Sequence, residues 1–375
     1  MSNRKPRLLL IFPGPHYDID HDFRARLELL STSYEGIVLT STPSEQHETF
    51  GAFQLITCRI SDTGGMRDNL RFFAMAIAFA RAERSAGRPI DLVITYDPLK
   101  SGILGVLVAR ILRAKLVVEV NGNYAAPATY VDMDSRLRAT LIRRTYTAIE
   151  KWVVRRSAGV KLLYPDQLDF CQPLLTGRVV RSFFDFVDLR PFRDLGEEKL
   201  ILFAGFPFFL KGVDVLIRAF LSIAPAHPDW KLKILGWYPK PIESYFALAK
   251  HPQIFHHPPV HHREMPDHMG VCAMLVLPSR SEAMGRVLLE AMAAAKPRIG
   301  ARVGGVSTVI EHGVDGFLFD SEDVDQLARL IESLIEDPAL RKTVGERGHA
   351  RAREQFTVEL YLEKVEEFYG AVLAS

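Results

Sequence analysis

Two glutamates in the second half of the chain are candidates for chemistry, because carboxylates can bind hydroxyl groups and stabilise positive charge. Glu282 and Glu290 are separated by seven residues within 278–290 (PSRSEAMGRVLLE). The apolar run 273–277 (AMLVL) predicts a buried strand before them, and the composition of 287–295 (VLLEAMAAA) favours a helix. We therefore expect Glu282 at the carboxyl end of a parallel strand, where open α/β sheets bind ligands, and Glu290 about two turns along the helix. Carboxylates there can accept hydrogen bonds from vicinal hydroxyls and stabilise positive charge on a sugar ring.

An isolated pair of this kind has a simpler interpretation, in which Glu282 helps to cap the helix and Glu290 is solvated. The sequence blocks on either side favour the interpretation in which the two glutamates bind a ligand. Downstream, 303–319 (VGGVSTVIEHGVDGFLF) combines a Gly-Gly turn, a helix start and a turn before a strand. Upstream, 201–220 (ILFAGFPFFLKGVDVLIRAF) combines a strand, a loop with one Lys-Gly and an amphipathic helix. In this order the three blocks resemble the donor-binding half of the retaining family 4 glycosyltransferases of the GT-B fold. That family has two glutamates separated by seven residues and followed by Ala-Met-Ala. Here Glu282, Glu290 and residues 291–293 match this pattern.

The resemblance extends more weakly into the N-terminal half. Residues 91–122 (DLVITYDPLKSGILGVLVARILRAKLVVEVNG) resemble the family's strand, Asp-Pro turn, helix and strand, and 182–192 (SFFDFVDLRPF) resembles the connection between its domains. Residues 1–90 match only in general α/β pattern. The resemblance thus covers most of the chain between residues 90 and 320.

Lys211 is the predicted diphosphate ligand. A cation and free backbone N–H groups at the start of a helix make a diphosphate site, and the family has a Lys at this position. The family usually has an Arg five or six residues earlier, whereas Phe206 and Gly205 stand there in this chain. Arg286 is therefore the candidate for the second positive charge, and Gly205 is included in the donor-binding set.

The loop after the predicted strand completes the donor site. Glu282, Ala283, Met284 and Gly285 stand where the family more commonly has Glu-Gly-Phe-Gly. Because this loop mainly supplies backbone N–H groups to the sugar and phosphate, Ala and Met are compatible with donor binding. The resemblance implies that Glu282 contacts the sugar hydroxyls and Glu290 the ribose hydroxyls.

On the acceptor side, Asn121 follows a strand-like run, where the family often has a His that touches the sugar. Asn donates and accepts hydrogen bonds but is no base at neutral pH. The family's retaining transfer is usually described as a front-face attack in which the leaving phosphate takes the acceptor proton. We therefore expect Glu282, Asn121 and Lys211 as the catalytic set, and Pro13 and Gly14 as an acceptor-side loop.

No metal-ligand set is identified in the sequence. Six of the twelve histidines lie in 251–268 (HPQIFHHPPVHHREMPDH), but no Cys or carboxylate pattern completes a site there. By resemblance this stretch flanks the nucleotide base. The three cysteines, Cys58, Cys171 and Cys272, are far apart in apolar contexts, which fits a reducing cytosol. The resemblance implies no cofactor and no metal, with a nucleotide-diphosphate sugar as co-substrate.

The segment 136–161 (RLRATLIRRTYTAIEKWVVRRSAGVK) has the pattern of a basic amphipathic helix. The apolar positions at helical spacing are Leu137, Leu141, Thr145, Ile149, Trp152 and Val153, and the basic ones are Arg138, Arg143, Arg144, Lys151, Arg155 and Arg156. Such a helix can lie on an anionic membrane surface. Alternatively, the apolar stripe packs on its own sheet with the arginines in solvent, and both interpretations remain open.

Size and composition predict an ordinary two-domain globular protein. The chain has 375 residues, 48% of them hydrophobic, and a net charge of +2, which argues against a dedicated nucleic-acid binder. No apolar stretch approaches the length of a membrane span, and the first apolar run is too short for a signal peptide. Strand-like runs are expected at 8–12, 36–39, 92–95, 116–120, 200–204, 231–235, 273–277 and 298–300. Because helical patterns separate these runs, we expect an α/β protein with two doubly wound, Rossmann-like parallel sheets. The resemblance implies that these form a protein of the GT-B type, with the two domains facing a cleft.

The domain boundary is expected within 185–199, where turn residues and charge precede a new strand. The predicted domains are 1–185 and 186–357, followed by a C-terminal helix at 358–375. The resemblance implies that the first binds the acceptor, that the second binds the donor, and that the C-terminal helix crosses back to the first domain.

The predicted function is retaining transfer of a sugar from a nucleotide-diphosphate sugar to a hydroxyl of a glycan or lipid-linked acceptor, in the synthesis of a cell-surface polysaccharide such as lipopolysaccharide or of a glycolipid. The predicted location is the cytoplasm or the inner face of its membrane. A NAD-dependent oxidoreductase is disfavoured because no G-x-G-x-x-G follows a strand-like run with an acidic residue about twenty positions on. A degenerate GT-B scaffold that binds a partner or glycan without turnover stays open, since Phe206 and Asn121 depart from the family pattern.

Overall fold

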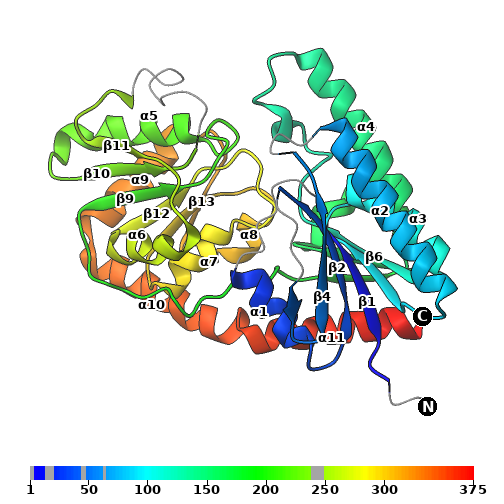
Figure 1. Cartoon of the computed structure of the whole chain (residues 1–375). Coiled ribbons are helices and arrows are strands. Elements are labelled where there is room, and N and C mark those ends of the chain that lie inside the picture. The colour runs from blue at the N-terminus through cyan, green and yellow to red at the C-terminus, as the bar shows by residue number, and fades with distance from the viewer. Residues whose placement is uncertain (1–3, 13–20, 44–47, 62–64, 238–248) are drawn as a thin grey trace. The chain divides into compact units, whose positions relative to one another are not determined.

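The computed structural model describes residues 4–12, 21–43, 48–61, 65–237 and 249–375 (Figure 1). They form two compact units. The first contains Met1–Gly122, Arg144–Phe186 and Val358–Ser375, and the second contains Asn123–Arg143 and Val187–Thr357. Residues 123–143 thus group with the second unit, although the sequence prediction assigned them to the N-terminal domain.

The first unit is built on a sheet of eight strands in the order β3-β4-β2-β1-β5-β6-β7-β8. Its strands are β1 (Arg7–Ile11), β2 (Glu35–Thr42), β3 (Thr49–Phe50), β4 (Phe53–Arg59), β5 (Leu92–Thr95), β6 (Lys115–Val120), β7 (Gly159–Leu162) and β8 (Val179–Ser182). All neighbours pair in parallel except β3, a two-residue edge strand antiparallel to β4.

Helices cover both faces of this sheet. They are α1 (His21–Leu30), α2 (Met66–Ser85), α3 (Lys100–Leu112), the 3₁₀ segment η2 (Pro165–Leu174), α11 (Val358–Ala374) and the part of α4 (Arg136–Val154) from residue 144 on. Alternate strand residues such as Leu8, Leu10 and Ile94 form one core with α1 and α11. On the other face α3 lies so close that a Cβ at Gly105 would be 2.3 Å from Thr95 Cγ2. A doubly wound unit follows from this two-sided burial.

A buried polar network connects α11 to the strands of the first unit. Arg26 Nη2 donates to Glu119 Oε1 at 3.0 Å and Arg26 Nη1 to Asp185 Oδ1 at 3.0 Å. Lys161 Nζ on β7 lies 3.2 Å from Glu119 Oε2, and the Tyr369 hydroxyl of α11 donates to Glu119 Oε1 at 3.3 Å. The sequence predicted one helical segment up to residue 161. In the structure α4 ends at Val154, and Lys161 lies in the buried strand β7 instead.

The second unit is built on a parallel sheet in the order β11-β10-β9-β12-β13-β14. Its strands are β9 (Leu200–Ala204), β10 (Lys231–Leu235), β11 (Ile254–His257), β12 (Met274–Leu277), β13 (Arg298–Ala301) and β14 (Phe317–Phe319). Every residue of β9, β12 and β13 is buried, which requires layers on both faces.

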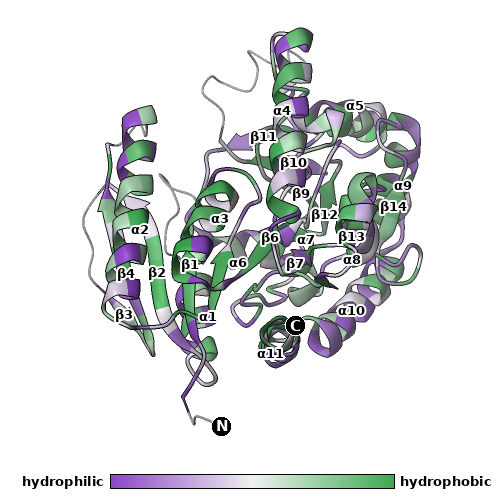
Figure 2. Cartoon of the chain, turned by 90° about the vertical axis from the view of Figure 1, so that its right-hand side faces the viewer, coloured by the Kyte–Doolittle hydropathy of each residue, from purple (hydrophilic) through white to green (hydrophobic). Residues whose placement is uncertain are grey.

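Those layers are helical. The helices are η1 (Pro127–Tyr130), α5 (Val213–Ile223), η3 (Ala224–Ala226), η6 (His262–Glu264), α6 (Met265–Val271), α7 (Arg286–Ala293), α8 (Val306–Val309), α9 (Val324–Glu336) and α10 (Pro338–Gln355). Helix α5 packs beside α9, and α7 packs against α10 and α6. In Figure 2, which is coloured by hydropathy, the strands are mainly hydrophobic and α10 is mainly hydrophilic.

The predicted fold class is confirmed. Both units are Rossmann-like, with parallel sheets between helices, and all eight predicted strand-like runs correspond to strands within one or two residues at their starts. The sequence prediction omitted the short strands β3, β7 and β8 and the strands β4 and β11. In the described part of the chain, no helix combines the length and apolar composition that crossing a bilayer requires.

Candidate functional site

Glu282 lies in the loop between β12 and α7, as the sequence predicts. Its side chain is buried and forms an ion pair with Lys211, with 2.5 Å between Oε2 and Nζ. The Ser279 hydroxyl donates to the same oxygen at 3.3 Å. Because β12 pairs with β9 in parallel, the loops that follow these two strands meet at one edge of the sheet. A carboxylate and an ammonium are thereby brought together from segments 71 residues apart.

Glycines make this approach possible. Gly212, the residue before α5, has φ of +70°, and a Cβ there would lie 2.0 Å from the carbonyl oxygen of Pro278. Gly205, at the end of β9, has φ of +153°, and its Cβ position is 3.7 Å from Cγ of Lys211. Both positions have positive φ and therefore favour glycine, and only glycine at 212 allows this backbone to approach that of Pro278 so closely.

Gly304 and Gly305 pack against the other side of the same loop. A Cβ at Gly304 would be 2.2 Å from the Glu282 carbonyl oxygen, and one at Gly305 would be 2.1 Å from that of Ala283. The Gly305 N–H donates to the Glu282 carbonyl at 3.2 Å. The Gly-Gly pair thus fixes the backbone of the loop that carries Glu282.

Two residues that the sequence prediction missed, Asn123 and Thr129, also hold this loop. Asn123 Nδ2 donates to the Ser281 hydroxyl at 3.2 Å and to the Glu282 carbonyl oxygen at 3.1 Å. The Thr129 hydroxyl donates to the Asn123 carbonyl oxygen at 2.7 Å. The sequence signal for Asn123 was that it is a second Asn, two residues after Asn121. Its hydrogen-bond partner, Glu282, lies 159 positions away in the sequence.

The rest of the predicted donor-binding set lies on the loop end and the first turns of α7. Met284 is buried, Ala283 is half-buried, and Gly285 is the N-cap with φ of +71°. Arg286 is the first residue of α7 and is exposed, and Glu290 follows at i+4 and is half-buried. Residues at this spacing share one helix face, so the two side chains line the same side of α7.

Arg280 is another cation near the strand ends. Arg280 Nη1 and Nη2 lie 2.7 and 2.8 Å from the Asp214 carboxylate oxygens, and Arg280 also pairs with Glu322. Its positive charge is therefore matched by two carboxylates. Phe206, at a position where the family has Arg, is 59% exposed. Arg286 remains the predicted second ligand of the diphosphate.

The histidine-rich segment contributes the edge strand β11 and helix α6. His256 Nε2 lies 3.3 Å from the Gly236 carbonyl oxygen, and its ring packs edge-on against Phe208, with 5.6 Å between ring centroids. His268 Nδ1 is 2.7 Å from Lys233 Nζ, and burial lowers the pKa of both groups. A role beside a nucleotide base stays a prediction.

In the first unit, Asn121 follows the last residue of β6. Its Nδ2 donates to the Tyr96 carbonyl oxygen at 2.9 Å, and its Oδ1 is buried without a hydrogen-bond partner among the described residues. This amide is therefore oriented by the residue that follows β5, and its oxygen keeps an unused acceptor among the described residues. Pro13 and Gly14 lie outside the described residues.

Helix α4 keeps much of its apolar stripe at the surface. The side chains of Leu137, Leu141 and Trp152 are 82%, 65% and 38% exposed, whereas Val153 and Val154 are buried. Most of the predicted stripe therefore does not pack on the sheet, whereas Val153 is buried and Ile149 is half-buried.

Comparison with known proteins gives a family match within the second unit. Residues 188–351 match the family model of the glycosyl transferases group 1. An uncharacterized glycosyltransferase of Methanocaldococcus jannaschii is 36% identical over 41% of this chain and 43% of its own length. A D-inositol 3-phosphate glycosyltransferase of Arthrobacter is 34% identical over 39% of this chain and 36% of its own. The chain thus aligns with less than half of these two proteins. The N-acetyl-alpha-D-glucosaminyl L-malate synthase of Bacillus anthracis is 26% identical over 80% of both chains.

Solved structures show the same fold. Sucrose-phosphate synthase from Thermosynechococcus elongatus superposes with a TM-score of 0.81 at 19% identity, covering 99% of this chain and 100% of that one. HepE of Anabaena, in complex with UDP-glucose, superposes with a TM-score of 0.74 at 16% identity, covering 97% and 99%. At sequence identities this low, the similarity shows only that the fold is shared. Both observations agree: the chain has the GT-B fold, and its residues 188–351 match the glycosyl transferases group 1.

Proposed function

We propose that the protein is a retaining glycosyltransferase of the family 4 type, which moves a sugar from a nucleotide-diphosphate sugar to a hydroxyl acceptor. The observation that carries this proposal is the Lys211–Glu282 pair at the carboxyl edge of the second sheet. It lies within the group 1 match, and carboxyl edges are where open α/β sheets bind ligands. The structures of HepE with UDP-glucose, and with UDP and glucose, support a nucleotide sugar as donor.

In this proposal, the pair exchanges partners when the donor binds. A diphosphate carries more negative charge than one carboxylate, so the Lys211 ammonium turns from Glu282 to the phosphate oxygens. Glu282 is then free to accept hydrogen bonds from the sugar hydroxyls. Glu290 accepts hydrogen bonds from the ribose, and Arg286 and the backbone N–H groups at the start of α7 add positive potential for the departing diphosphate.

The transfer step itself needs no side-chain base. The acceptor hydroxyl attacks the anomeric carbon on the face that the diphosphate leaves, and a phosphate oxygen takes its proton. Asn121 uses its free acceptor oxygen to orient a sugar hydroxyl. Lys211 stabilises the charge that develops on the leaving group, which is a role that needs neither a metal nor a cofactor.

For the acceptor we propose a glycan or lipid-linked molecule at the inner face of a membrane, in the synthesis of a cell-surface polysaccharide or glycolipid. The exposed Leu137, Leu141 and Trp152 support attachment through α4, and each nearby basic residue adds about 1 kcal/mol on an anionic leaflet. Co-sedimentation with vesicles tests this attachment. Arg144→Ser with Arg155→Ser should weaken binding to anionic vesicles, whereas Arg347→Ser with Arg353→Ser on α10 should not. Binding that is equal for both variants, or absent at low salt, contradicts attachment through α4.

The donor is identified by a thermal-shift screen against UDP, GDP, ADP, CMP and dTDP species. The cognate nucleotide at 100 times its dissociation constant should add about 2.7 kcal/mol of stability. Transfer is then measured with the matching nucleotide sugar. The acceptor panel should include inositol phosphates and malate, because two relatives are named for these, besides lipid-linked glycans.

A scaffold without turnover is the second candidate, favoured by the exposed Phe206 in place of a cation. Nucleotide binding with no donor hydrolysis and no transfer to any acceptor would favour this scaffold and contradict the enzyme.

A further inference from the structure

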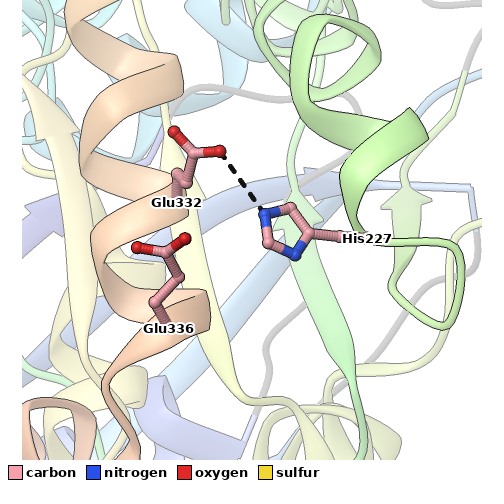
Figure 3. A group of neighbouring side chains, drawn as sticks. All are labelled: His227, Glu332 and Glu336. Atoms are coloured by element: carbon pink, nitrogen blue, oxygen red, sulfur yellow. Dashed lines mark ion pairs between the residues drawn. The ribbon is translucent and has the colours of Figure 1, made fainter.

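Three side chains of the second unit converge where the loop before β10 meets α9 (Figure 3). His227 follows η3, and Glu332 and Glu336 lie one turn apart at the end of α9. His227 Nε2 is 3.5 Å from Glu332 Oε1. One nitrogen or oxygen atom from each of the three residues lies within 4.8 Å of the other two.

The group is electrostatically incomplete. His227 Nε2 is buried and has no hydrogen-bond partner in the described part of the chain. Among the same residues, neither glutamate forms an ion pair with Lys or Arg. Like charges at i and i+4 on a helix repel, so the two carboxylates destabilise the end of α9 unless a cation lies between them. A buried imidazole nitrogen that faces two carboxylates, neither with a Lys or Arg partner among the described residues, is an arrangement that a metal ion would complete.

The group is also separate from the predicted donor site. His227 precedes β10, whereas Lys211 and Glu282 follow β9 and β12. In a parallel sheet, segments that precede strands and segments that follow them lie at opposite edges. The group therefore cannot serve the sugar or the diphosphate, and a ligand there would not depend on the proposed transfer reaction.

We propose that His227, Glu332 and Glu336 bind a divalent transition-metal ion, for which Zn²⁺ is the probe. One imidazole and two carboxylates are ligands that Zn²⁺ accepts at about 2.0–2.2 Å, with water in the remaining position. The ion takes the lone pair of neutral His227 Nε2 and balances both carboxylates. Mg²⁺ is a poorer fit, because it prefers six oxygen ligands in octahedral geometry.

The bound ion would act structurally. The His227 carbonyl oxygen accepts from the Trp230 N–H at 3.1 Å and from Gln253 Nε2 at 2.9 Å, so His227 already belongs to the turn that leads into β10 and β11. A metal bond to the side chain would fasten this turn to α9. Zinc should therefore raise the melting temperature of the second unit.

Calorimetric titration of Zn²⁺ into metal-stripped protein without a histidine tag tests the site. We expect a tight site in the wild type, a zinc-dependent rise in melting temperature, and no such rise with Mg²⁺. His227→Gln should weaken zinc affinity about tenfold or more and abolish the rise. Glu336→Gln should also weaken it, and because Glu336 is exposed, that change leaves the fold intact.

The control is His257→Gln, which removes one ring of the His257–His268 pair, whose centroids are 5.1 Å apart. This pair is the competing place for zinc, and the control should retain the tight site and the thermal shift. The proposal is overturned if the wild type binds no zinc, if Glu336→Gln and His227→Gln bind it as the wild type does, or if only His257→Gln loses the tight site.

Discussion

Replacing Lys211 with Met should destabilise the free protein, because the Glu282 carboxylate loses its cation. The side chains of Lys211 and Glu282 are 19% and 10% exposed. Removing one partner of a fully buried pair costs about 3–5 kcal/mol, and exposed pairs contribute about 1 kcal/mol or less. The Ser279 hydroxyl stays 3.3 Å from the carboxylate and limits the loss. We therefore expect about 2 kcal/mol, which is a fall in melting temperature of about 4–8 °C.

The assay is a double-mutant cycle by urea unfolding with Lys211→Met, Glu282→Gln and the double variant. Residues in direct contact show coupling of about 0.5–3 kcal/mol, so the double variant should be less destabilised than the sum of the single ones. The matched control is Lys199–Asp229 of the same unit, 3.1 Å apart but 60% and 73% exposed. Its coupling should be much smaller, because water screens both charges.

The same variants test the exchange of partners. Lys211→Met should weaken binding of the nucleotide diphosphate far more than binding of the nucleoside, because only the former carries the charge that Lys211 meets. Glu282→Gln should spare free-nucleotide binding and reduce turnover of the nucleotide sugar. A Lys211–Glu282 coupling no larger than that of Lys199–Asp229 would refute the reasoning about the ion pair. Equal loss of diphosphate and nucleoside would refute the role in donor binding.

Three further outcomes are expected. Glu290→Ala should weaken nucleotide binding by about 1–3 kcal/mol in calorimetry, by leaving ribose hydroxyls unpaired, and unchanged affinity would remove Glu290 from the site. Burial raises the pKa of Glu150 from its ordinary 4.5 to about 8. Between these two pH values the folded state holds a proton that the unfolded state releases, so the stability of the fold decreases as the pH rises from 4.5 to about 8. Glu150→Gln should therefore raise the melting temperature at pH 8 and change it little at pH 4, and an equal rise at both would contradict the shift. Arg26→Leu should cost about 3–5 kcal/mol in urea unfolding by leaving Glu119 and Asp185 short of a cation, whereas a loss below 1 kcal/mol would mean that Lys161 alone balances them.

Much of the architecture could be predicted because its signals are local. Apolar runs of four or five residues gave the starts and ends of β5, β9 and β10 without error. The same reasoning placed Glu282 after a strand, Glu290 on a helix and Lys211 before α5, since each position depends only on neighbouring residues. Strands with weak or charged patterns escaped it. In β7 (GVKL), Lys161 looks like a surface residue until Glu119 of the neighbouring strand is known to match its charge.

What the sequence alone determined is therefore the kind of element wherever the local pattern is strong, together with the residues at the carboxyl ends of those strands. Tertiary structure alone decided which of those residues meet. Lys211 reaches Glu282 because β9 lies beside β12, Asn123 holds the Glu282 loop from 159 positions away, and His227 faces α9 across more than a hundred residues of chain. Periodicity is fixed by near neighbours, but strand order depends on how whole faces are buried together, and no local pattern contains that information.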